Sequence, residues 1–457
     1  MRRERRFLLE DDDLRVRSLG TGQPGGGEPE DPAADDYEPH VGGRSVDSVH
    51  GIWLRSQSDV STVPRYPLRP FVAPSRVLAG PGSSAAIGAE LSALGVSPSA
   101  GPVLVVADAA LIALGLVDSP VQSLGDAGLD VVVGPGVGAE PEPATIKALV
   151  ASLPGGTAAA IVAIGGGSAI DAAKLVAAAL TNELALGEGL TPDTALAPLA
   201  PLAAIPTTAG TGAEATAVAM LWHRQRKRIF VHQRLVPRQA TLDPDLLAAL
   251  PRPVAAASGL DALSHAVESL LSTFQTPLTR RAAESSLTRL ATALPLEHEQ
   301  TQPASRNEMS LGAFEAGLAL NASVVIGHSL AYAIAERTGL SHGVTCAMAL
   351  PYCLAYNRAG SEVAMAHMAE LIGIADGAAG FRAWVADLTR ALGIPGSLES
   401  VGIAESDLAA MASECCDAYP RPNNPVPIEP EAVARLLRHF QVGDLDRAWA
   451  DQPAWAA

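Results

Sequence analysis

The stretch Gly165-Gly-Gly-Ser-Ala-Ile-Asp-Ala-Ala-Lys174 follows directly on the apolar run Ala158-Ala-Ala-Ile-Val-Ala-Ile164. The run has the length and composition of a buried strand, and the glycines lead it into a helix-like segment. Missing side chains let a phosphate approach the backbone amides, and the helix N-terminus adds partial positive charge. Neither G-x-G-x-x-G nor G-x-x-x-x-G-K-[ST] is present. A tight turn capped by Ser168, with Asp171 three positions later, fits the same residues and is compatible with phosphate binding.

Strand-like and helix-like segments alternate on both sides of this junction. Further strands are expected at 76–80, 103–107, 131–133 and 202–205, with helices at 85–94 and 143–153. This alternation indicates an open parallel sheet of the dinucleotide-binding kind. From Pro251 onward the pattern is helical, without a convincing strand. We therefore predict an α/β Rossmann-like N-terminal domain with a parallel sheet, followed by an all-α C-terminal helical domain.

A second loop, Pro206-Thr-Thr-Ala-Gly-Thr-Gly-Ala-Glu214, follows the strand at 202–205. Its three threonines and two glycines predict a hydroxyl-lined loop beside the glycine turn. A basic cluster follows at Arg224, Arg226, Lys227 and Arg228. By itself this cluster also fits the solvated tip of a hairpin.

One carboxylate and three histidines form a candidate metal site in the helical part. Asp261 and His265 are four residues apart in an apolar, helix-like run, which puts both side chains on one face. His328 and His342 flank a second helix-like run, which Gly339 is placed to cap. Three imidazoles and one carboxylate suit Fe(II) or Zn(II) and leave room for a substrate oxygen. Taken alone, the Asp–His pair is more often a surface or mutually satisfied pair than a pair of ligands.

Length and local composition predict three parts. The chain has 457 residues, which is too long for one compact core. Its first residues carry charge blocks, Gly25-Gly26-Gly27 and few apolar side chains, which cannot offset the entropy of ordering. We expect a disordered extension over 1–65, a Rossmann-like dinucleotide-binding domain over 66–250, and an all-helical metal-binding domain over 251–457.

Charge and cysteine usage exclude several classes of protein. The formal net charge is −17, which argues against a nucleic-acid partner. Four cysteines in so long a chain make no disulfide framework, and we expect Cys346, Cys353, Cys415 and Cys416 to be small core residues. A zinc site built from Cys346 and Cys353 is a weak alternative. Neither a signal peptide nor an uninterrupted apolar span is evident, so a cytoplasmic protein without a membrane partner is expected.

Five motifs, in this order along the chain, resemble the iron-containing (group III) alcohol dehydrogenase family. They are GGGSAIDAAK, PTTAGTGAEAT, LDPDLLAALP, GLDALSHAVES and GHSLAYAIAERTGLSHGVTCAMALPYCLAYN. The resemblance covers roughly residues 67 to 440. It implies a dehydroquinate synthase-like architecture, with a Rossmann-like domain, a helical domain and an active site in the cleft between them.

The resemblance also implies roles for individual residues. Asp261, His265, His328 and His342 occupy the family's four metal-ligand positions. Asp108 matches a position that binds the adenosine ribose, and a carboxylate there would repel a 2′-phosphate, which favours NAD(H) over NADP(H). The other cofactor positions are matched by Gly166, Gly167, Ser168 and Asp171 on the pyrophosphate turn, by Thr207, Thr208 and Thr211 on the threonine loop, and by Lys227.

The chain departs from the family pattern at several positions. Tyr332 stands where the family often has a histidine near the nicotinamide. Its hydroxyl can relay a proton, but an unperturbed pKa of about 10 makes it a poor base at neutral pH. Tyr332 is therefore the catalytic candidate, with a role either in relay or only in shaping the pocket. Glu142 replaces an asparagine, Ala213 a serine and Ser341 a proline, which puts the Glu142 cofactor contact in doubt.

The resemblance implies a metal-dependent, NAD(H)-linked alcohol dehydrogenase or aldehyde reductase acting on a short primary alcohol or aldehyde. Fe(II) is the expected ion and Zn(II) the alternative, and a homodimer is expected from the family. Within the enzyme class, one rival is a phosphonoacetaldehyde reductase-like enzyme for an acidic aldehyde, with Arg224 offering an anion contact. Another is a maleylacetate reductase, which works without metal. A remote alternative is a non-catalytic NAD-binding assembly component.

Overall fold

Six parallel strands form the central sheet, in the order β1-β8-β5-β4-β2-β3. The computed structural model describes residues 69–224, 226–299 and 302–451, apart from the side chains of 297–299. In register, Val103 of β2 lies opposite Ala160 of β4 on one side and Val131 of β3 on the other. The six strands are β1 (Arg76–Ala79), β2 (Val103–Ala107), β3 (Val131–Val133), β4 (Ala160–Gly165), β5 (Leu202–Pro206) and β8 (Gln239–Leu242).

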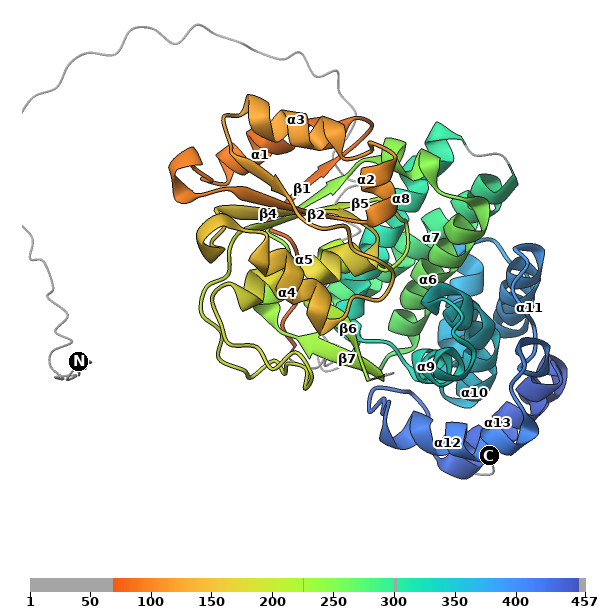
Figure 1. Ribbon diagram of the computed structural model, residues 1–457. Helices are drawn as coiled ribbons and strands as arrows, with labels where there is room; N and C mark the ends of the chain where they lie inside the picture. The colour runs from red at the N-terminus through yellow and green to blue at the C-terminus, as the bar shows by residue number, and fades with distance from the viewer. Residues whose placement is uncertain (1–68, 225, 300–301, 452–457) are drawn as a thin grey trace, which may run out of the picture. The chain divides into compact units, whose positions relative to one another are not determined.

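Helices cover both faces of this sheet, which explains why its central strands are continuously apolar (Figure 1). Val103 and Val105 of β2 point to the face that holds α1 and α3, whereas Leu104 and Val106 point to the face that holds α4 and α5. All five residues of β2 are fully buried. These helices are α1 (Ile87–Ala93), α3 (Asp118–Asp126), α4 (Pro143–Ala151) and α5 (Gly167–Ala179), and a short α2 (Ala109–Ala113) follows β2.

The sequence expectations hold for five of the six sheet strands and miss β8. β8 is a four-residue strand that lies between β1 and β5, although it comes last along the chain. Its residues Gln239 and Thr241 are polar yet buried, and the two side chains hydrogen-bond each other. A mixed polar pattern of this length gives no strand signal. The basic cluster lies on an antiparallel hairpin of β6 (Val218–His223) and β7 (Arg226–Val231), as the hairpin interpretation predicts.

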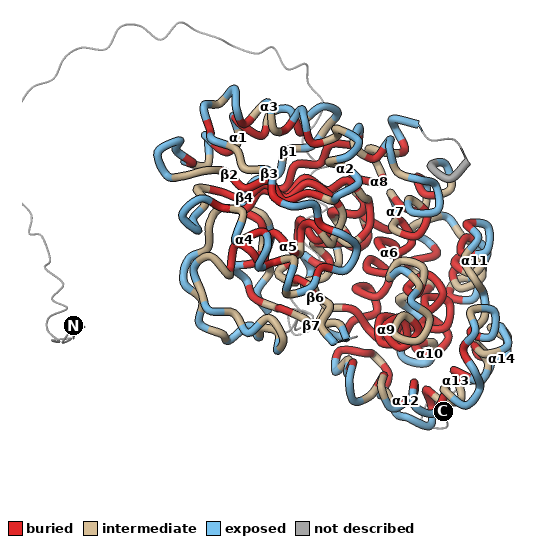
Figure 2. Tube along the Cα trace, viewed as in Figure 1, coloured by how far each residue is buried: buried red, intermediate tan, exposed pale blue. Residues whose placement is uncertain are grey.

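The second half of the described chain is helical, with no strand among its described residues after Leu242. One hydrophobic core joins the long helices, and Figure 2 shows their inner faces and the sheet strands as the buried parts. The helices are α6 (Arg252–Leu271), α7 (Pro277–Glu299), α8 (Pro303–Ala319), α9 (Ile326–Thr338), α10 (His342–Leu371), α11 (Gly377–Ala391), α12 (Leu408–Asp417), α13 (Pro430–Gln441) and α14 (Leu445–Ala450). Helix α9 ends at Gly339, which adopts the left-handed conformation as the cap prediction requires.

Short 3-10 helices connect many of these elements. They are Ser83–Ala86, Pro98–Ala100, Pro154–Gly156, Ala213–Ala215, Gln233–Leu235, Pro244–Ala249, Leu320–Ala322, Glu399–Val401 and Glu405–Asp407. Helix α14 lies where no helix was expected from the sequence. In this six-residue helix, Ala448 is buried in the core and Trp449 packs against it. Two apolar contacts in six residues are too few to show a helical period in the sequence.

Two sequence predictions remain predictions. The extension expected over 1–65 lies outside the described residues. The described residues all belong to one compact unit, Arg65–Ala457. Within it, the sheet part ends and the helical part begins between Pro244–Ala249 and α6. Because the two parts form one unit, the predicted domain boundary at residue 250 remains a prediction. Among the described helices, none is by itself long and apolar enough to cross a membrane. The segments Pro303–Ala322 and Ile326–Thr338 satisfy that criterion only together, across a bend of 107°.

Candidate metal centre and cofactor cleft

Three helices bring the predicted metal-binding residues together. Asp261 and His265 lie one turn apart on α6, His328 lies in the first turn of α9, and His342 is the first residue of α10. Asp261 Oδ1 lies 3.6 Å from His265 Nε2, 4.0 Å from His328 Nε2 and 3.9 Å from His342 Nε2. The carboxylate oxygen therefore faces three imidazole nitrogens, from three different helices.

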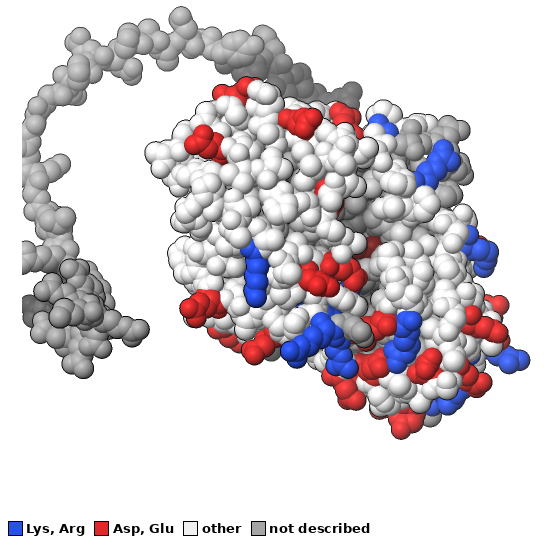
Figure 3. All heavy atoms as spheres, viewed as in Figure 1, with Lys and Arg blue, Asp and Glu red and all other residues white. Residues whose placement is uncertain are grey.

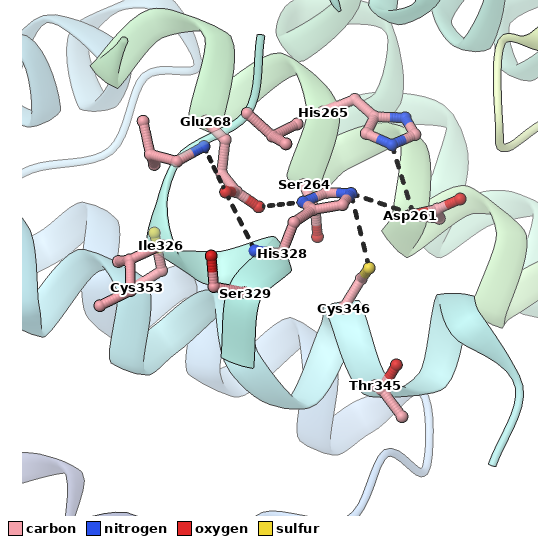
Figure 4. Close-up of polar contacts among 12 residues, drawn as sticks. Asp261, Ser264, His265, Glu268, Ile326, His328, Ser329, Thr345, Cys346 and Cys353 are labelled. Carbon is pink, nitrogen blue, oxygen red and sulfur yellow. Dashed lines mark hydrogen bonds and ion pairs between the residues drawn. The ribbon is translucent and has the colours of Figure 1, made fainter. Parts of the chain in front are cut away.

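Cys346 is a further member of this cluster and was expected to be an ordinary core residue. Its Sγ lies 3.6 Å from His328 Nε2 (Figure 4). The same sulfur lies 3.5 Å from His342 Nε2. Asp261, His328, His342 and Cys346 each place one donor atom within 4.8 Å of the others. The cysteine follows His342 by four residues on α10, so the helical spacing rule that pairs Asp261 with His265 would also have found it.

Glu268 orients the His328 ring through its Nδ1 nitrogen. Its Oε1 lies 2.6 Å from His328 Nδ1, and Oε2 accepts the backbone N–H groups of Val325 and His328. Both side chains are buried (Figure 4). This contact also explains Gly327, because a Cβ there would lie 2.6 Å from Glu268 Oε1. Glu268 lies seven residues after Asp261 on the same helix face, and sequence reasoning missed it.

The electrostatics of the cluster favour neutral imidazoles at His265 and His342 beside an ionised Asp261 carboxylate. Burial lowers the pKa of His265, and it also lowers the pKa of His342 well below the usual value, with the nearby Lys227 acting in the same direction. Burial tends to raise the pKa of Asp261, but His265, His342 and His328 together bring it below its ordinary value. A metal ion needs neutral imidazole and ionised carboxylate as ligands. Asp261 Oδ1 and His265 Nδ1 are buried, and neither has a hydrogen-bond partner among the described residues.

The glycine turn and the threonine loop pack directly against each other at the carboxyl ends of β4 and β5. A Cβ on Gly167 would lie 2.8 Å from Thr211 Cγ2, and one on Gly166 would lie 3.3 Å from Thr208 Cγ2. The Thr207 N–H donates to Gly165 O, which pins the two segments together. The structure thus brings the two predicted cofactor segments side by side.

The capping interpretation of the glycine turn is wrong. Helix α5 begins at Gly167, its N-cap is Gly166, and no side chain caps it. Ser168 Oγ instead accepts the N–H of Glu140. Asp171 Oδ2 accepts the N–H of Met220 and so ties α5 to β6. The first-turn amides of α5 are therefore not taken up by a side-chain cap, which suits a phosphate.

Asp108 lies at the end of β2, beside the glycine turn. Its Oδ2 accepts the N–H of Gly166 at 2.9 Å. Burial raises the pKa of this carboxyl, and the Gly166 hydrogen bond opposes that shift. A carboxylate at such a strand end can accept a hydrogen bond from a ribose hydroxyl, and the hydrogen bond from Gly166 fixes the orientation of this carboxylate.

A cleft of about 590 Å³ joins the cofactor segments to the metal cluster. Lys227 Nζ lies in this region, 3.7 Å from Glu140 Oε1 and 5.8 Å from the centre of the Tyr332 ring. Figure 3 shows acidic and basic side chains gathered on this face around the hairpin β6–β7 and α12. Residues from both halves of the chain line the cleft, including Gly167, Ser168, Asp171, Thr211, Met220, Trp222, Lys227, Ser341 and His342. The other predicted cofactor residues are not among the residues that line the cleft: Asp108, Gly166, Thr207 and Thr208.

Tyr332 lies beside the metal cluster rather than in the cleft lining. Its ring stacks on His342, with centroids 5.3 Å apart, and burial raises its pKa to about 12. The carbon at the centre of the Arg421 guanidinium lies 5.7 Å from the centre of the same ring. Arg421 Nε is buried and lacks a hydrogen-bond partner within the described ranges. Sequence reasoning missed Arg421, because an isolated arginine in a Pro-rich loop gives no local signal.

These features fit both the divalent metal ion and the dinucleotide cofactor that the sequence predicts. The orphaned Asp261 oxygen amid imidazole nitrogens and a thiol is a donor set for a divalent transition ion. The uncapped N-terminus of α5, reached through glycines, suits a pyrophosphate.

Comparisons with known proteins agree with this geometry. Residues 74–244 match the family described as "Iron-containing alcohol dehydrogenase", and residues 255–440 match "Fe-containing alcohol dehydrogenase family, C-terminal". The chain is 30% identical over 386 residues to a 1,3-propanediol dehydrogenase from Citrobacter freundii, covering 82% of this chain and 99% of that protein. It is 28% identical over 380 residues to an NAD-dependent methanol dehydrogenase from Bacillus methanolicus, covering 81% of this chain and 98% of the relative.

Solved structures lead to the same family. A crystal structure of 1,3-propanediol oxidoreductase superposes with a TM-score of 0.77 at 29% identity, and covers 82% of this chain and 100% of its own. Sequence and fold therefore agree over both the sheet part and the helical part. The chain belongs to the iron-containing alcohol dehydrogenase family and is an oxidoreductase of that family.

Proposed function

We propose that this enzyme transfers hydride reversibly between NAD(H) and a short primary alcohol or aldehyde, with a divalent metal held by Asp261, His265, His328 and His342. One observation carries the proposal: His342 belongs to the metal cluster and also lines the cleft that contains Gly167, Thr211 and Lys227. A cofactor bound along the glycine turn would therefore end beside the metal-bound substrate. The family's description favours Fe(II), and the donors also suit Zn(II).

The metal, when bound, would polarise the substrate oxygen as a Lewis acid, and the nicotinamide would give or take the hydride. The chain's own residues position both groups. Glu268 keeps the His328 proton on Nδ1, which leaves Nε2 free to bind. The first turn of α5 and Thr211 would hold the pyrophosphate. Trp222 and Met220 of the hairpin form part of the cleft wall and limit the access of water.

The cofactor preference rests on Asp108. Its carboxylate stands at the end of β2, with one oxygen fixed by Gly166. A second negative charge from a 2′-phosphate would be repelled there, so we propose NAD(H) rather than NADP(H). We further propose that the enzyme works as a homodimer on small molecules alone, which the mass in solution, measured by light scattering, will test.

The test uses protein purified without oxygen, loaded with Fe(II) or Zn(II), and given NADH with a panel of short aldehydes. We expect NADH oxidation by the wild type, and its loss in His328→Ala together with the bound metal. The variant should keep the wild-type circular dichroism spectrum and NADH affinity. Full turnover by a metal-free His328→Ala would refute the assignment of the metal centre.

A second candidate substrate class is an acidic aldehyde, favoured by the two cations that face Tyr332. Lys227 Nζ lies 5.8 Å and the Arg421 guanidinium carbon 5.7 Å from the centre of that ring. The positive charge of Arg421 beside Tyr332 would favour a carboxylate, phosphonate or sulfonate on the substrate. If this class is correct, kcat/KM for acidic aldehydes will exceed that for neutral ones, and Arg421→Met will reverse the order. A wild-type preference for neutral aldehydes would eliminate it.

A further inference from the structure

Ser323, in the turn that leads into α9, has a backbone conformation that is essentially reserved for glycine. Its φ is 63° and its ψ is 169°, a combination that strains any residue with a Cβ atom. His328, a proposed metal ligand, follows five residues later in the first turn of α9. A strained backbone of this kind persists only where the surrounding structure holds it.

The buried side chains of Ser272 and Asn423 hold the residues on either side of Ser323. Ser272, at the carboxyl end of α6, donates from Oγ to Ala322 O at 2.6 Å. Asn423 Nδ2 donates to Val324 O and to Ser272 Oγ, each at 2.9 Å. The carbonyl groups before and after the strained residue are thus fixed by one connected pair of side chains.

Asn424, the next residue along the chain, joins the start of α9 to α10. Its Oδ1 accepts the N–H of Ile326 at 3.1 Å, and its Nδ2 donates to Asn357 Oδ1 on α10 at 2.7 Å. Glu268 of α6 accepts two other N–H groups at the start of α9 (Figure 4). Side chains from α6 and from the loop of Asn424 therefore satisfy the first amides of α9, which a helix cannot satisfy by itself.

The loop that carries the two asparagines is stiff and closely packed. Pro422 and Pro425 stand directly before and after the pair and restrict the backbone there. The loop lies against α10 at Gly360, where a Cβ would be 3.1 Å from Pro425 O. The pair thus has a fixed position from which it bridges α6, α9 and α10, the three helices that carry the proposed ligands.

We propose that Asn423 and Asn424 are positioning residues of the metal centre: they hold the turn 322–326 and thereby fix His328 relative to α6 and α10. This inference rests on the proposed metal-dependent function and adds two residues that act only through His328. Without the pair, the backbone at Ser323 relaxes and the first turn of α9 shifts. The His328 ring then moves away from the proposed ligands on the other two helices.

Metal binding by the full-length enzyme provides the first test. We expect Asn424→Ala to lose about tenfold or more in Zn(II) affinity, measured by chelator competition, as for other outer partners of ligating histidines. The absorption bands of its Co(II) form should also change, because they depend on ligand geometry. Tyr356→Phe is the matched control, since Tyr356 Oη donates from α10 to Pro427 O of the same loop at 2.7 Å. This variant should keep the affinity and the bands of the wild type.

Urea denaturation of the metal-free protein tests the strained turn separately. Ser323→Gly fits the same backbone conformation without strain. If Asn423 holds that strain, Asn423→Ala will lower the urea midpoint less in the Ser323→Gly background than in the wild type. Equal losses in both backgrounds would show that Asn423 does not hold the turn.

The outcomes separate this inference from the proposed function. Unchanged affinity and bands in Asn424→Ala would overturn the positioning role, even with a loss of stability. An equal loss of affinity in Tyr356→Phe would overturn it as well, because general loosening of the loop would then be the cause. If Asn424→Ala does not fold, the zinc affinity of Asn423→Ala decides in the same way. A wild type that binds no metal would refute the proposed function, whereas the coupling of Ser323 to Asn423 is measured without metal.

Discussion

Glu268 Oε1 and His328 Nδ1 lie 2.6 Å apart in a fully buried pair that links α6 to α9. The carboxylate fixes which nitrogen of the imidazole carries the proton, and thereby which nitrogen is free for a metal. It also binds two backbone N–H groups at the start of α9. One side chain thus sets both the position and the tautomer of a proposed ligand.

Replacing this carboxylate should weaken metal binding without unfolding the helical part. We expect Glu268→Gln to lose about 10–100-fold in metal affinity, the range found for partners of ligating histidines. Competition with a chelator of known affinity measures the change. The matched control is Glu284→Gln, because Glu284 forms a similar pair with His367, 2.9 Å apart, on α7 and α10 outside the metal group. An unchanged affinity in Glu268→Gln would contradict the role assigned to Glu268.

Gly327 is required by the close approach of Glu268. In Gly327→Ala the new Cβ would lie 2.6 Å from Glu268 Oε1, so the carboxylate must move. We expect about 1–3 kcal/mol less stability and a lower metal content. Chemical denaturation and metal analysis provide the measurements. Gly125→Ala on α3 is the control, since its Cβ would meet no atom within 4 Å and should be neutral or slightly stabilising. Equal behaviour of the two variants would argue against a tight contact.

Asp108 should control the choice between NADH and NADPH. Asp108→Asn keeps an oxygen that can accept the Gly166 N–H but removes the charge. We expect the NADPH to NADH ratio of kcat/KM to rise about tenfold, equivalent to about 1.4 kcal/mol. Asp118→Asn, an exposed carboxylate of the same domain, should leave the ratio unchanged. A ratio that stays the same in Asp108→Asn would place the ribose elsewhere.

The hydroxyl of Tyr332 should not act as a base near neutral pH, because burial raises its pKa to about 12. Tyr332→Phe keeps the stack on His342, and we expect it to retain kcat within a few-fold, with an unaltered pH–rate profile from pH 6 to 9. Tyr332→Ala removes the stack and should lower kcat strongly. A loss on the order of 100-fold in Tyr332→Phe would instead establish proton relay through the hydroxyl.

Buried Glu214 should make stability depend on pH. Burial raises its pKa from 4.5 to about 7, so the folded state favours the protonated form. Its stabilising contribution is complete below about pH 4.5 and is lost as the pH rises through about 7. The free energy of unfolding should therefore fall between about pH 4.5 and pH 7, by on the order of 1–3 kcal/mol from this group.

Urea denaturation at a series of pH values measures this slope. Glu214→Gln should flatten it near pH 7, while Glu183→Gln, an exposed residue of the same half, should leave it as in the wild type. An unchanged slope in Glu214→Gln would show that the carboxylate is charged throughout. Lys174, whose pKa burial lowers to about 8, acts at higher pH and in the opposite direction.

The sequence predicted the parallel sheet because its central strands are uniformly apolar and alternate with helices. It did not reveal β8, since Gln239 and Thr241 satisfy each other inside the sheet and leave no apolar pattern. The helical spacing of Asp261 and His265 predicted a shared face, and His328 and His342, which the sequence also predicted as ligands, lie beside that face on α9 and α10. The spacing of Cys346, four residues after His342, would have pointed to the same cluster. Arg421 could not be assigned from the sequence, because its position beside Tyr332 depends on how distant segments pack.

The metal cluster and the cofactor cleft meet at His342, which belongs to both. The most direct test follows deuterium from the reactive position of labelled NADH into an aldehyde, using metal-loaded enzyme. We expect a singly deuterated alcohol, loss of labelling with a chelator, and recovery when Fe(II) or Zn(II) is restored. Deuterium transfer that continues undiminished in chelated, metal-free protein would contradict this expectation.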